Sequence, residues 1–168
     1  MSSVMRVLAI DLGDRRIGLA VSDEHGRVHG LSTLGRSASI DGDVQRLKVI
    51  CTETRVEQLA VGLPLHSDGR WSEQAEATHA WAVALAHAVS LPVCFVDERY
   101  STERAAQLVG RASRGSGGGP PGPVRREAHR AALDQAAARL ILEDYADPAL
   151  VISVASAKVL AGKQDDRK

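Results

Sequence analysis

The chain has 168 residues, the usual size of one domain with a single hydrophobic core. Lys plus Arg and Asp plus Glu number 21 each and aromatic residues make up only 3%, so the composition excludes a uniformly basic or acidic surface and leaves few rings for stacking on bases. Cys51 and Cys94 are the only cysteines and no early apolar stretch has the length of a signal peptide or membrane span, so we expect a reduced, cytoplasmic protein without membrane contact.

The first elements are apolar runs separated by turn residues. Val4–Leu12 is an apolar run around Arg6, and Ile17–Val21 is a second one, with the turn-like Gly13–Arg16 between them. These runs predict the two strands of a hairpin. Arg27–Leu34 predicts a third strand, so the chain is expected to open on a three-strand meander.

Helical and strand patterns then alternate. Apolar residues at helical spacing predict a helix over Asp43–Thr54, and the short apolar run Gln58–Leu63 predicts a strand that stops at Pro64. A second helix is expected to begin after an N-cap at Ser72 and to end before Pro92.

The last third of the chain predicts a strand, a short helix, a loop and a long helix. "LPVCFVDER" has the strand pattern, and Ser101 is expected to cap a helix that runs through Val109. Glycine costs backbone entropy and proline lacks an N–H donor, so the Gly/Pro-rich stretch predicts a mobile loop over about 110–124. Arg125–Tyr145 is the longest helical pattern.

The order of these elements predicts an α/β protein. We expect a mixed five-stranded sheet, in which an antiparallel meander is followed by alternating helices and strands, with helices on both faces. The predicted domain covers residues 1–147, and residues 148–168 are expected to form a C-terminal tail.

Two of the predicted strands end in an acidic residue. The period of two puts Asp11 on the same strand face as Ala9, and Glu98 on the same face as Val96, whereas Asp97 falls on the opposite face. Both strands have the composition of strands buried on two sides, where a solvated charge is hard to arrange.

A third carboxylate, Asp134, lies within the apolar stripe of the longest helix, with Ala131, Ala138 and Ile141. An unpaired charge there costs several kcal/mol. Three carboxylates in one place repel each other unless a cation holds them, and hard oxygen ligands favour Mg²⁺ or Mn²⁺. The pattern indicates phosphoryl transfer assisted by two such ions, with Asp11 as the central ligand.

Each of these carboxylates also has a purely structural interpretation. Asp11 could be a turn former at a strand end, and Asp134 could be a residue at the edge of its helix. Glu98 could form a salt bridge with Arg99 or Arg104. The residues alone leave both interpretations open.

Four segments together carry a more specific signal. They are "IDLGDRRIGLAVSD", "VGLPLHSDG", "VDERYST" and "LDQAAARLILEDY", in this order between Val7 and Tyr145. They resemble the motifs of the YqgF family, also called RuvX-like, which is described as Holliday junction resolvases and as pre-16S rRNA nucleases. The resemblance implies an RNase H-like fold and nuclease activity, with Asp11, Glu98 and Asp134 as the catalytic and metal-binding carboxylates. Gly62, within the second segment, could shape one wall of the cleft, but a strand-end turn explains it equally well, and it is assigned no catalytic role.

The chain departs from the family in two places. The lysine-rich stretch usual before the last motif is replaced by the Gly/Pro loop, and a tail follows Tyr145. Arginines flank the loop and predict a local basic arm that contacts phosphates, although a solvated surface without a partner would have the same composition. Together with the arginines of the first motif, the candidate nucleic-acid-binding residues are Arg15, Arg16, Arg99, Arg111, Arg114, Arg125 and Arg126.

The main hypothesis is a metal-dependent nuclease that processes the 5′ end of precursor 16S rRNA in ribosome biogenesis. One alternative is a Holliday junction resolvase acting on branched DNA, because phosphate contacts carry no sequence information. A second is a noncatalytic nucleic-acid or transcription-factor binding module with the same fold. The length argues against a nucleotide-binding protein of the sugar-kinase type, since those clamp the nucleotide between two such domains. Self-association as a homodimer stays open.

Overall fold

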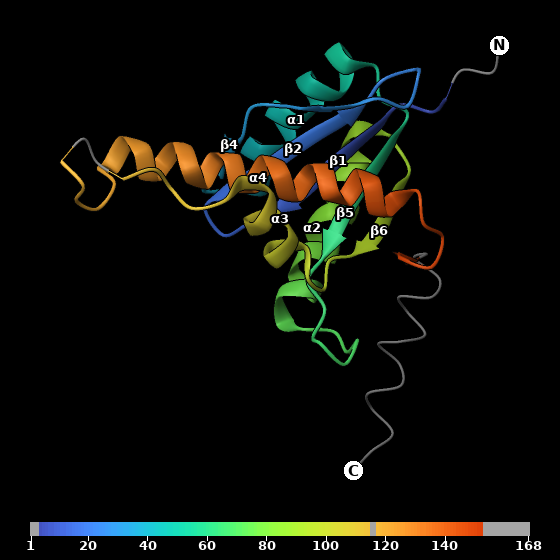
Figure 1. Cartoon of the computed structure of the whole chain (residues 1–168). Coiled ribbons are helices and arrows are strands. Elements are labelled where there is room, and N and C mark those ends of the chain that lie inside the picture. Colours follow the sequence, from blue (N-terminus) through green and yellow to red (C-terminus); the bar gives the residue numbers. More distant parts are fainter. Residues whose placement is uncertain (1–3, 115–116, 153–168) are drawn as a thin grey trace.

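The computed structural model describes residues 4–114 and 117–152, which form one mixed sheet with helices on both faces (Figure 1). No helix in these ranges combines the length and apolar composition needed to cross a membrane. The elements in chain order are β1 (Val7–Leu12), β2 (Arg16–Ser22), β3 (Val28–Gly30), β4 (Leu34–Gly35), α1 (Ile40–Thr54), β5 (Gln58–Leu63), α2 (Glu73–Val89), β6 (Val93–Asp97), α3 (Ser101–Val109), α4 (Pro123–Tyr145) and β7 (Val151–Ile152).

The sheet confirms the predicted mixed arrangement. β1 and β2 form the antiparallel hairpin, while β5 lies parallel to β1 on one side and to β6 on the other. The order across the sheet is β3-β2-β1-β5-β6-β7, and β4 also pairs with β2. Because β1, β5 and β6 are parallel, their carboxyl ends meet at one edge of the sheet, where the sequence places Asp11 and Glu98.

The predicted third strand, Arg27–Leu34, is wrong in detail, because two short strands take its place. β3 and β4 both pair with β2, and the residues between them are held by α4 instead. Gln135 Nε2 donates to the carbonyl of Leu31 at 3.0 Å, and Thr33 Oγ1 donates to the carbonyl of Ala131 at 3.3 Å. The tertiary contact with α4 therefore interrupts the strand.

The chain returns to the sheet after α4. β7 pairs antiparallel with β6, with Ile152 opposite Phe95, so the first residues of the predicted tail extend the sheet. The rest of that tail, residues 153–168, lies outside the described residues. With β4 and β7, the sheet has seven strands within residues 4–114 and 117–152, two more than the five predicted.

The two faces of the sheet carry separate cores. Leu8 and Ile10 of β1 pack into the cluster that includes α1 and α2, whereas Val7 and Ala9 pack into the cluster that includes α4. This alternation follows the period of two along a strand. Asp11 continues the series of Val7 and Ala9, so it lies on the α4 face.

One of the two predicted helix N-caps is confirmed and the other is wrong. Ser72 caps α2 as predicted, because its Oγ accepts a hydrogen bond from the backbone N of Ala75 at 2.9 Å. The predicted cap at Ser101 is wrong: Ser101 is the first residue of α3, and the N-cap is Tyr100, which has a φ of 90° and makes no side-chain cap bond. The φ value shows that the chain turns sharply between Glu98 and α3.

The predicted loop before the longest helix contains no helix or strand over 110–114 and 117–122. α4 begins at Pro123, two residues earlier than the start predicted at Arg125. Proline suits the first turn of a helix, because the N–H that it lacks would have no partner within the helix.

Candidate active site

Asp11 and Glu98 form a hydrogen-bonded carboxyl pair at the edge where β1 and β6 end. Burial raises the pKa of Asp11 to about 6, and burial together with the charge of Asp11 raises the pKa of Glu98 well above its usual range. The two carboxyls are hydrogen-bonded to each other, and such a bond forms only while one of them is protonated, so the pair shares one proton. Both residues keep some exposed surface, so a ligand can reach them.

Gly62 of β5 provides the space that the Glu98 side chain occupies. A Cβ atom at Gly62 would lie 2.6 Å from the carboxyl carbon of Glu98 and 2.7 Å from Cδ1 of Ile141 on α4. Both distances are far below a normal contact, so only glycine leaves room here. Gly62 thus has a role in the site that its interpretation as a turn residue did not include.

Asp134 lies on the sheet side of α4, close to the same edge. Its backbone carbonyl sits against Gly18, the residue paired with Asp11 across the β1–β2 hairpin, and a Cβ atom at Gly18 would lie 2.2 Å from the carbonyl oxygen. The charge of Asp134 contributes to the raised pKa of Asp11. The helix-edge interpretation therefore does not describe its position, since 24% of its side chain is exposed and that side chain faces the sheet.

The Asp134 carboxylate is nevertheless bound to an arginine. Arg16 Nε donates to its Oδ2 at 2.5 Å, and Arg16 Nη1 lies 3.6 Å from Oε1 of Glu127, two turns earlier on α4. Within the described ranges, no three His, Cys, Asp or Glu residues are grouped so that they could hold a metal ion as they stand. The structure therefore joins two of the three predicted carboxylates and places the third beside them.

The residues behind Glu98 complete its surroundings. The Ser101 side chain hydrogen-bonds to Glu98, and the charge of Asp144 on α4 raises the pKa of Glu98. Arg104 Nη1 donates to both Asp144 oxygens at 2.8 Å. Asp144 was not among the predicted site residues, although it lies three residues after Ile141 in the stripe that contains Asp134.

The salt bridge considered for Glu98 is not formed. Arg99 binds Asp97 instead, with Nη2 at 2.7 Å from Oδ2, and Arg104 binds Asp144. Arg99, the partner of Asp97, also donates to the carbonyl of Ser67 at 3.3 Å. Arg99 is therefore engaged within the protein.

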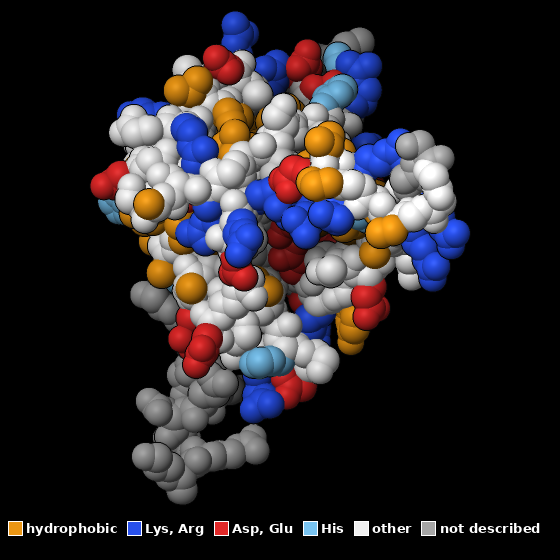
Figure 2. Space-filling model, turned by 90° about the vertical axis from the view of Figure 1, so that its left-hand side faces the viewer, with side chains coloured by type: hydrophobic (Ala, Val, Ile, Leu, Met, Phe, Trp, Pro, Cys, Tyr) orange, Lys and Arg blue, Asp and Glu red, His pale blue; other side chains and the backbone are white. Residues whose placement is uncertain are grey.

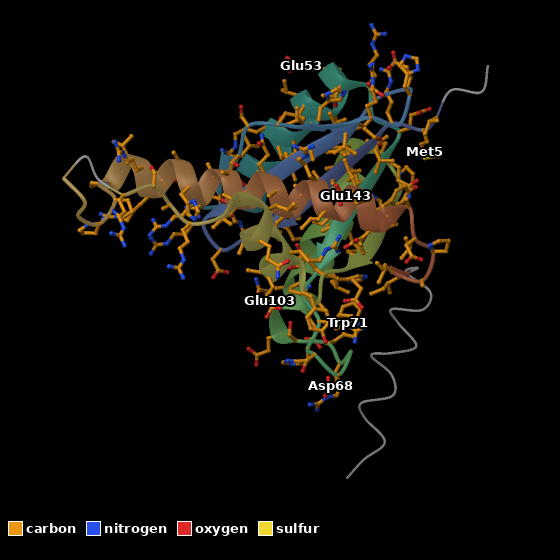
Figure 3. All side chains as sticks on the ribbon, in the orientation of Figure 1. Met5, Glu53, Asp68, Trp71, Glu103 and Glu143 are labelled. Atoms are coloured by element: carbon orange, nitrogen blue, oxygen red, sulfur yellow. The ribbon has the colours of Figure 1, made fainter. Side chains whose placement is uncertain are left out.

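The loop between β5 and α2 contributes no further carboxylate to the pair. Asp68 lies at its tip and points away from the body of the protein (Figure 3). Its Oδ2 accepts a hydrogen bond from Arg70 Nε at 2.6 Å.

The predicted nucleic-acid-binding arginines fall into two groups. Arg16 and Arg99 are partly buried and bound to carboxylates, whereas the others are exposed. Figure 2 shows Lys and Arg side chains gathered around a hollow with acidic side chains in its depth. The exposed group consists of Arg15 in the β1–β2 turn, Arg111 and Arg114 after α3, and Arg125 and Arg126 at the start of α4.

Two of these arginines connect α4 with the loop before it. Arg125 donates to the carbonyl of Arg114, and Arg126 Nη1 donates to the carbonyl of Pro121 at 2.7 Å. Each of these bonds uses one nitrogen of the guanidinium. The remaining N–H groups can bind phosphate oxygens.

The chemistry of the carboxyl pair fits a divalent cation. Two buried carboxyls that share one proton are the state expected when no cation neutralises them. Asp11 and Glu98 present hard oxygen donors of the kind that bind Mg²⁺ or Mn²⁺, and Asp134 is near enough for its charge to raise the pKa of Asp11. A bound divalent ion would take the place of the shared proton.

A family model described as "RuvX: Holliday junction resolvase" matches residues 5–148. A protein of Moorella thermoacetica named "Putative pre-16S rRNA nuclease" is 37% identical over 144 residues, which cover 85% of this chain and 95% of the relative. A protein of Geobacillus kaustophilus with the same name is 36% identical over 145 residues, 85% of this chain and 98% of the relative. Among solved structures, Thermus thermophilus RuvC in complex with a Holliday junction substrate shares 19% identity at a TM-score of 0.49, covering 85% of this chain and 95% of that chain. The region matched by the family model contains Asp11, Glu98 and Asp134.

Proposed function

The chain belongs to the RuvX family, and on that premise we propose that it is a nuclease that hydrolyses phosphodiester bonds with a divalent cation and acts on the 5′ end of precursor 16S rRNA. Relatives at 35% identity or more that carry the name of a pre-16S rRNA nuclease support RNA as the substrate. The family description supports phosphodiester hydrolysis.

The observation that carries the proposal is the pair of Asp11 and Glu98. Two carboxyls held together in a desolvated position destabilise the metal-free fold, because one of them has to keep its proton. A bound cation would offset this cost. Their position at the carboxyl ends of parallel strands is also the usual place for a site in a sheet of this kind. A noncatalytic binding module would have no need of such a pair.

Each group then has a distinct role. Asp11 and Glu98, with Asp134, would hold the cation, which when bound supplies an activated water and offsets charge on the phosphoryl oxygens. Gly62 and Ser101 fix the Glu98 carboxyl, so that the donor oxygens are positioned before substrate arrives. The exposed arginines Arg15, Arg111, Arg114, Arg125 and Arg126 would bind the phosphates on either side of the scissile bond.

A cleavage assay with two substrates tests the proposal. The purified chain is incubated with an RNA that carries the 5′ leader of precursor 16S rRNA and with a four-way DNA junction, in Mg²⁺, in Mn²⁺ and in EDTA. We expect cleavage of the RNA in either metal and none in EDTA. The variant Asp11→Asn is the control for contaminating nucleases.

The two substrates separate the alternatives. Cleavage of the junction alone would replace the RNA assignment with that of a Holliday junction resolvase. Absence of cleavage on both substrates, by a folded protein that binds them, would favour the noncatalytic binding module.

A further inference from the structure

Arg16 binds the Asp134 carboxylate, which lies near the carboxyl pair. Its Nε lies 2.5 Å from Oδ2 of Asp134, and Arg16 and Asp134 are each only 24% exposed at the side chain, so the ion pair is partly desolvated. The Asp134 carboxylate raises the pKa of the guanidinium further. Arg16 thus supplies to Asp134 the positive charge that a divalent cation would otherwise supply.

The backbones on both sides of this ion pair are fixed. The carbonyl of Asp134 packs against Gly18, and Arg16 is the first residue of β2, which is paired with both β1 and β4. α4 therefore cannot move closer to β2 without a steric clash. Rotation of the side chains is the smallest change that releases the Asp134 carboxylate.

The structure also contains a second position for the guanidinium. Arg16 Nη1 already lies 3.6 Å from Oε1 of Glu127, whose side chain is 60% exposed. Glu127 precedes Asp134 by seven residues, so both lie on the same side of α4. A rotation of Arg16 toward Glu127 moves the guanidinium away from Asp134 and toward the solvent-exposed end of the site, where Arg15 is also exposed.

We infer that Arg16 exchanges partners during substrate binding, and that this exchange couples cation binding to nucleic-acid binding. A phosphate of the nucleic acid draws the guanidinium away from Asp134, because an arginine binds a phosphate with charge-assisted bonds at least as strong as those it makes with a carboxylate. The released Asp134 then joins Asp11 and Glu98 as a cation ligand. Without nucleic acid, Arg16 keeps the cation site incomplete.

The inference rests on the proposed function and adds that nucleic-acid binding controls the affinity of the site for the cation. Since coupling between two binding events is reciprocal, nucleic acid tightens cation binding by the factor by which the cation tightens nucleic-acid binding. We expect a factor of roughly ten, within the usual range for such couplings. Arg16 is here a positioning residue, because it acts through Asp134.

The test measures Mn²⁺ binding to the full chain by calorimetric titration, without RNA and with an RNA hairpin that carries 2′-O-methyl groups. Because hydrolysis by a cation-activated water does not use the 2′-OH, a denaturing gel after each titration establishes that the hairpin is still intact. Titration of the hairpin alone, and of the hairpin with Asp11→Asn, accounts for Mn²⁺ bound by the RNA. We expect the parent to bind Mn²⁺ roughly tenfold more tightly with the hairpin. Arg16→Gln should bind Mn²⁺ more tightly than the parent when no RNA is present, and the hairpin should add little.

A matched control uses an arginine in another ion pair. Arg27 pairs with Asp23 at the far end of β2, so Arg27→Gln removes the same charge without touching Asp134. Arg27→Gln should behave like the parent. Circular dichroism establishes that each variant is folded. If Arg16→Gln is unstable, Arg16→Lys takes its place; it keeps the charge and should retain part of the coupling.

The outcomes separate this inference from the function on which it rests. Equal Mn²⁺ affinity of the parent with and without the hairpin, or weaker binding by Arg16→Gln than by the parent in the absence of RNA, would overturn the partner exchange and leave the nuclease assignment intact. A parent that binds no Mn²⁺ at the Asp11 site, even with the hairpin, would overturn both.

Discussion

The carbonyl oxygen of Asp134 occupies the space where a side chain at Gly18 would lie. A Cβ atom at Gly18 would come within 2.2 Å of that oxygen, so the contact is possible only with glycine. Because Gly18 pairs with Asp11 across the hairpin, this contact limits how closely α4 approaches the sheet beside Asp11.

Replacement of Gly18 by alanine should therefore destabilise the protein. The obstacle is backbone, which cannot rotate away, and overpacking of this kind costs about 1–3 kcal/mol. Gly35→Ala is the control, because a Cβ atom at Gly35 would meet nothing within 4 Å. Chemical denaturation of the two variants should show a large loss for Gly18→Ala only, and equal stabilities would mean that α4 does not rest on Gly18 in solution.

Asp11→Asn should abolish cation-dependent cleavage, because the amide is a poor ligand for Mg²⁺ or Mn²⁺. The same variant should melt at a higher temperature than the parent in EDTA, because it removes one member of a repelling carboxyl pair. Asp14→Asn makes the same change at an exposed position three residues away and should alter neither property. Undiminished turnover by Asp11→Asn would remove Asp11 from the site.

The stability of the metal-free protein should fall as the pH rises from 5 to 8. The pKa of Asp11 is raised to about 6 in the folded state from an ordinary 3.8, and that of Glu98 is raised as well. The folded state therefore holds protons that the unfolded state has lost, and stability decreases with pH where this is so. Melting temperatures in EDTA across this range test the sign. Asp11→Asn should flatten the dependence, and a parent that becomes more stable toward pH 8 would contradict it.

Asp134→Glu should slow cleavage strongly while changing stability far less. The additional methylene moves the carboxylate relative to Asp11 and Glu98, and small displacements in a site for phosphoryl transfer cost large factors in rate. Glu143→Asp changes length by the same amount on the same helix, at a side chain that is 57% exposed, and should affect cleavage little. Single-turnover cleavage rates of both variants are compared with that of the parent. A parent-like rate for Asp134→Glu would count against a ligand role.

Removal of the exposed arginines around the 110–122 loop should weaken nucleic-acid binding and reduce its dependence on salt, since each lost phosphate contact releases one counterion fewer. Affinity is measured at several salt concentrations for the parent and two quadruple alanine variants. An unchanged salt slope in the first variant would exclude this basic arm from binding. The first variant replaces Arg111, Arg114, Arg125 and Arg126, and the control replaces the exposed Arg27, Lys48, Arg55 and Arg139.

Local sequence signals were sufficient to predict the elements whose ends are set by a particular residue type, such as proline. The strand over Gln58–Leu63 is predicted to the residue, because a continuous apolar run is typical of a strand buried on both faces and Pro64 ends it. The meeting of Asp11 and Glu98 also follows in part from the sequence. The period of two assigns each acid to one face of its own strand, and parallel strands bring their carboxyl ends to one edge. That the two faces are the same is seen only in the structure, where Ala9 and Val96 share one core cluster.

The other features depend on partners distant in the chain. Arg16 and Asp134 are 118 residues apart, and nothing around either residue predicts that they bind each other. The space at Gly62 and the positive φ of Tyr100 likewise reflect the packing around Glu98 rather than a local pattern. Such long-range contacts set the state of the site, whereas the sequence pattern indicates only its members.

The division of the outer strand into β3 and β4 has a consequence for the molecule in a crowded solution. A long, regular sheet edge offers unpaired N–H and C=O groups on which a strand from another copy can add. Here the edge beside β2 consists of segments of three and two residues, and the carbonyl of Leu31 between them is taken by Gln135. A neighbouring chain therefore finds no continuous template on this side, which protects the folded protein against edge-to-edge aggregation.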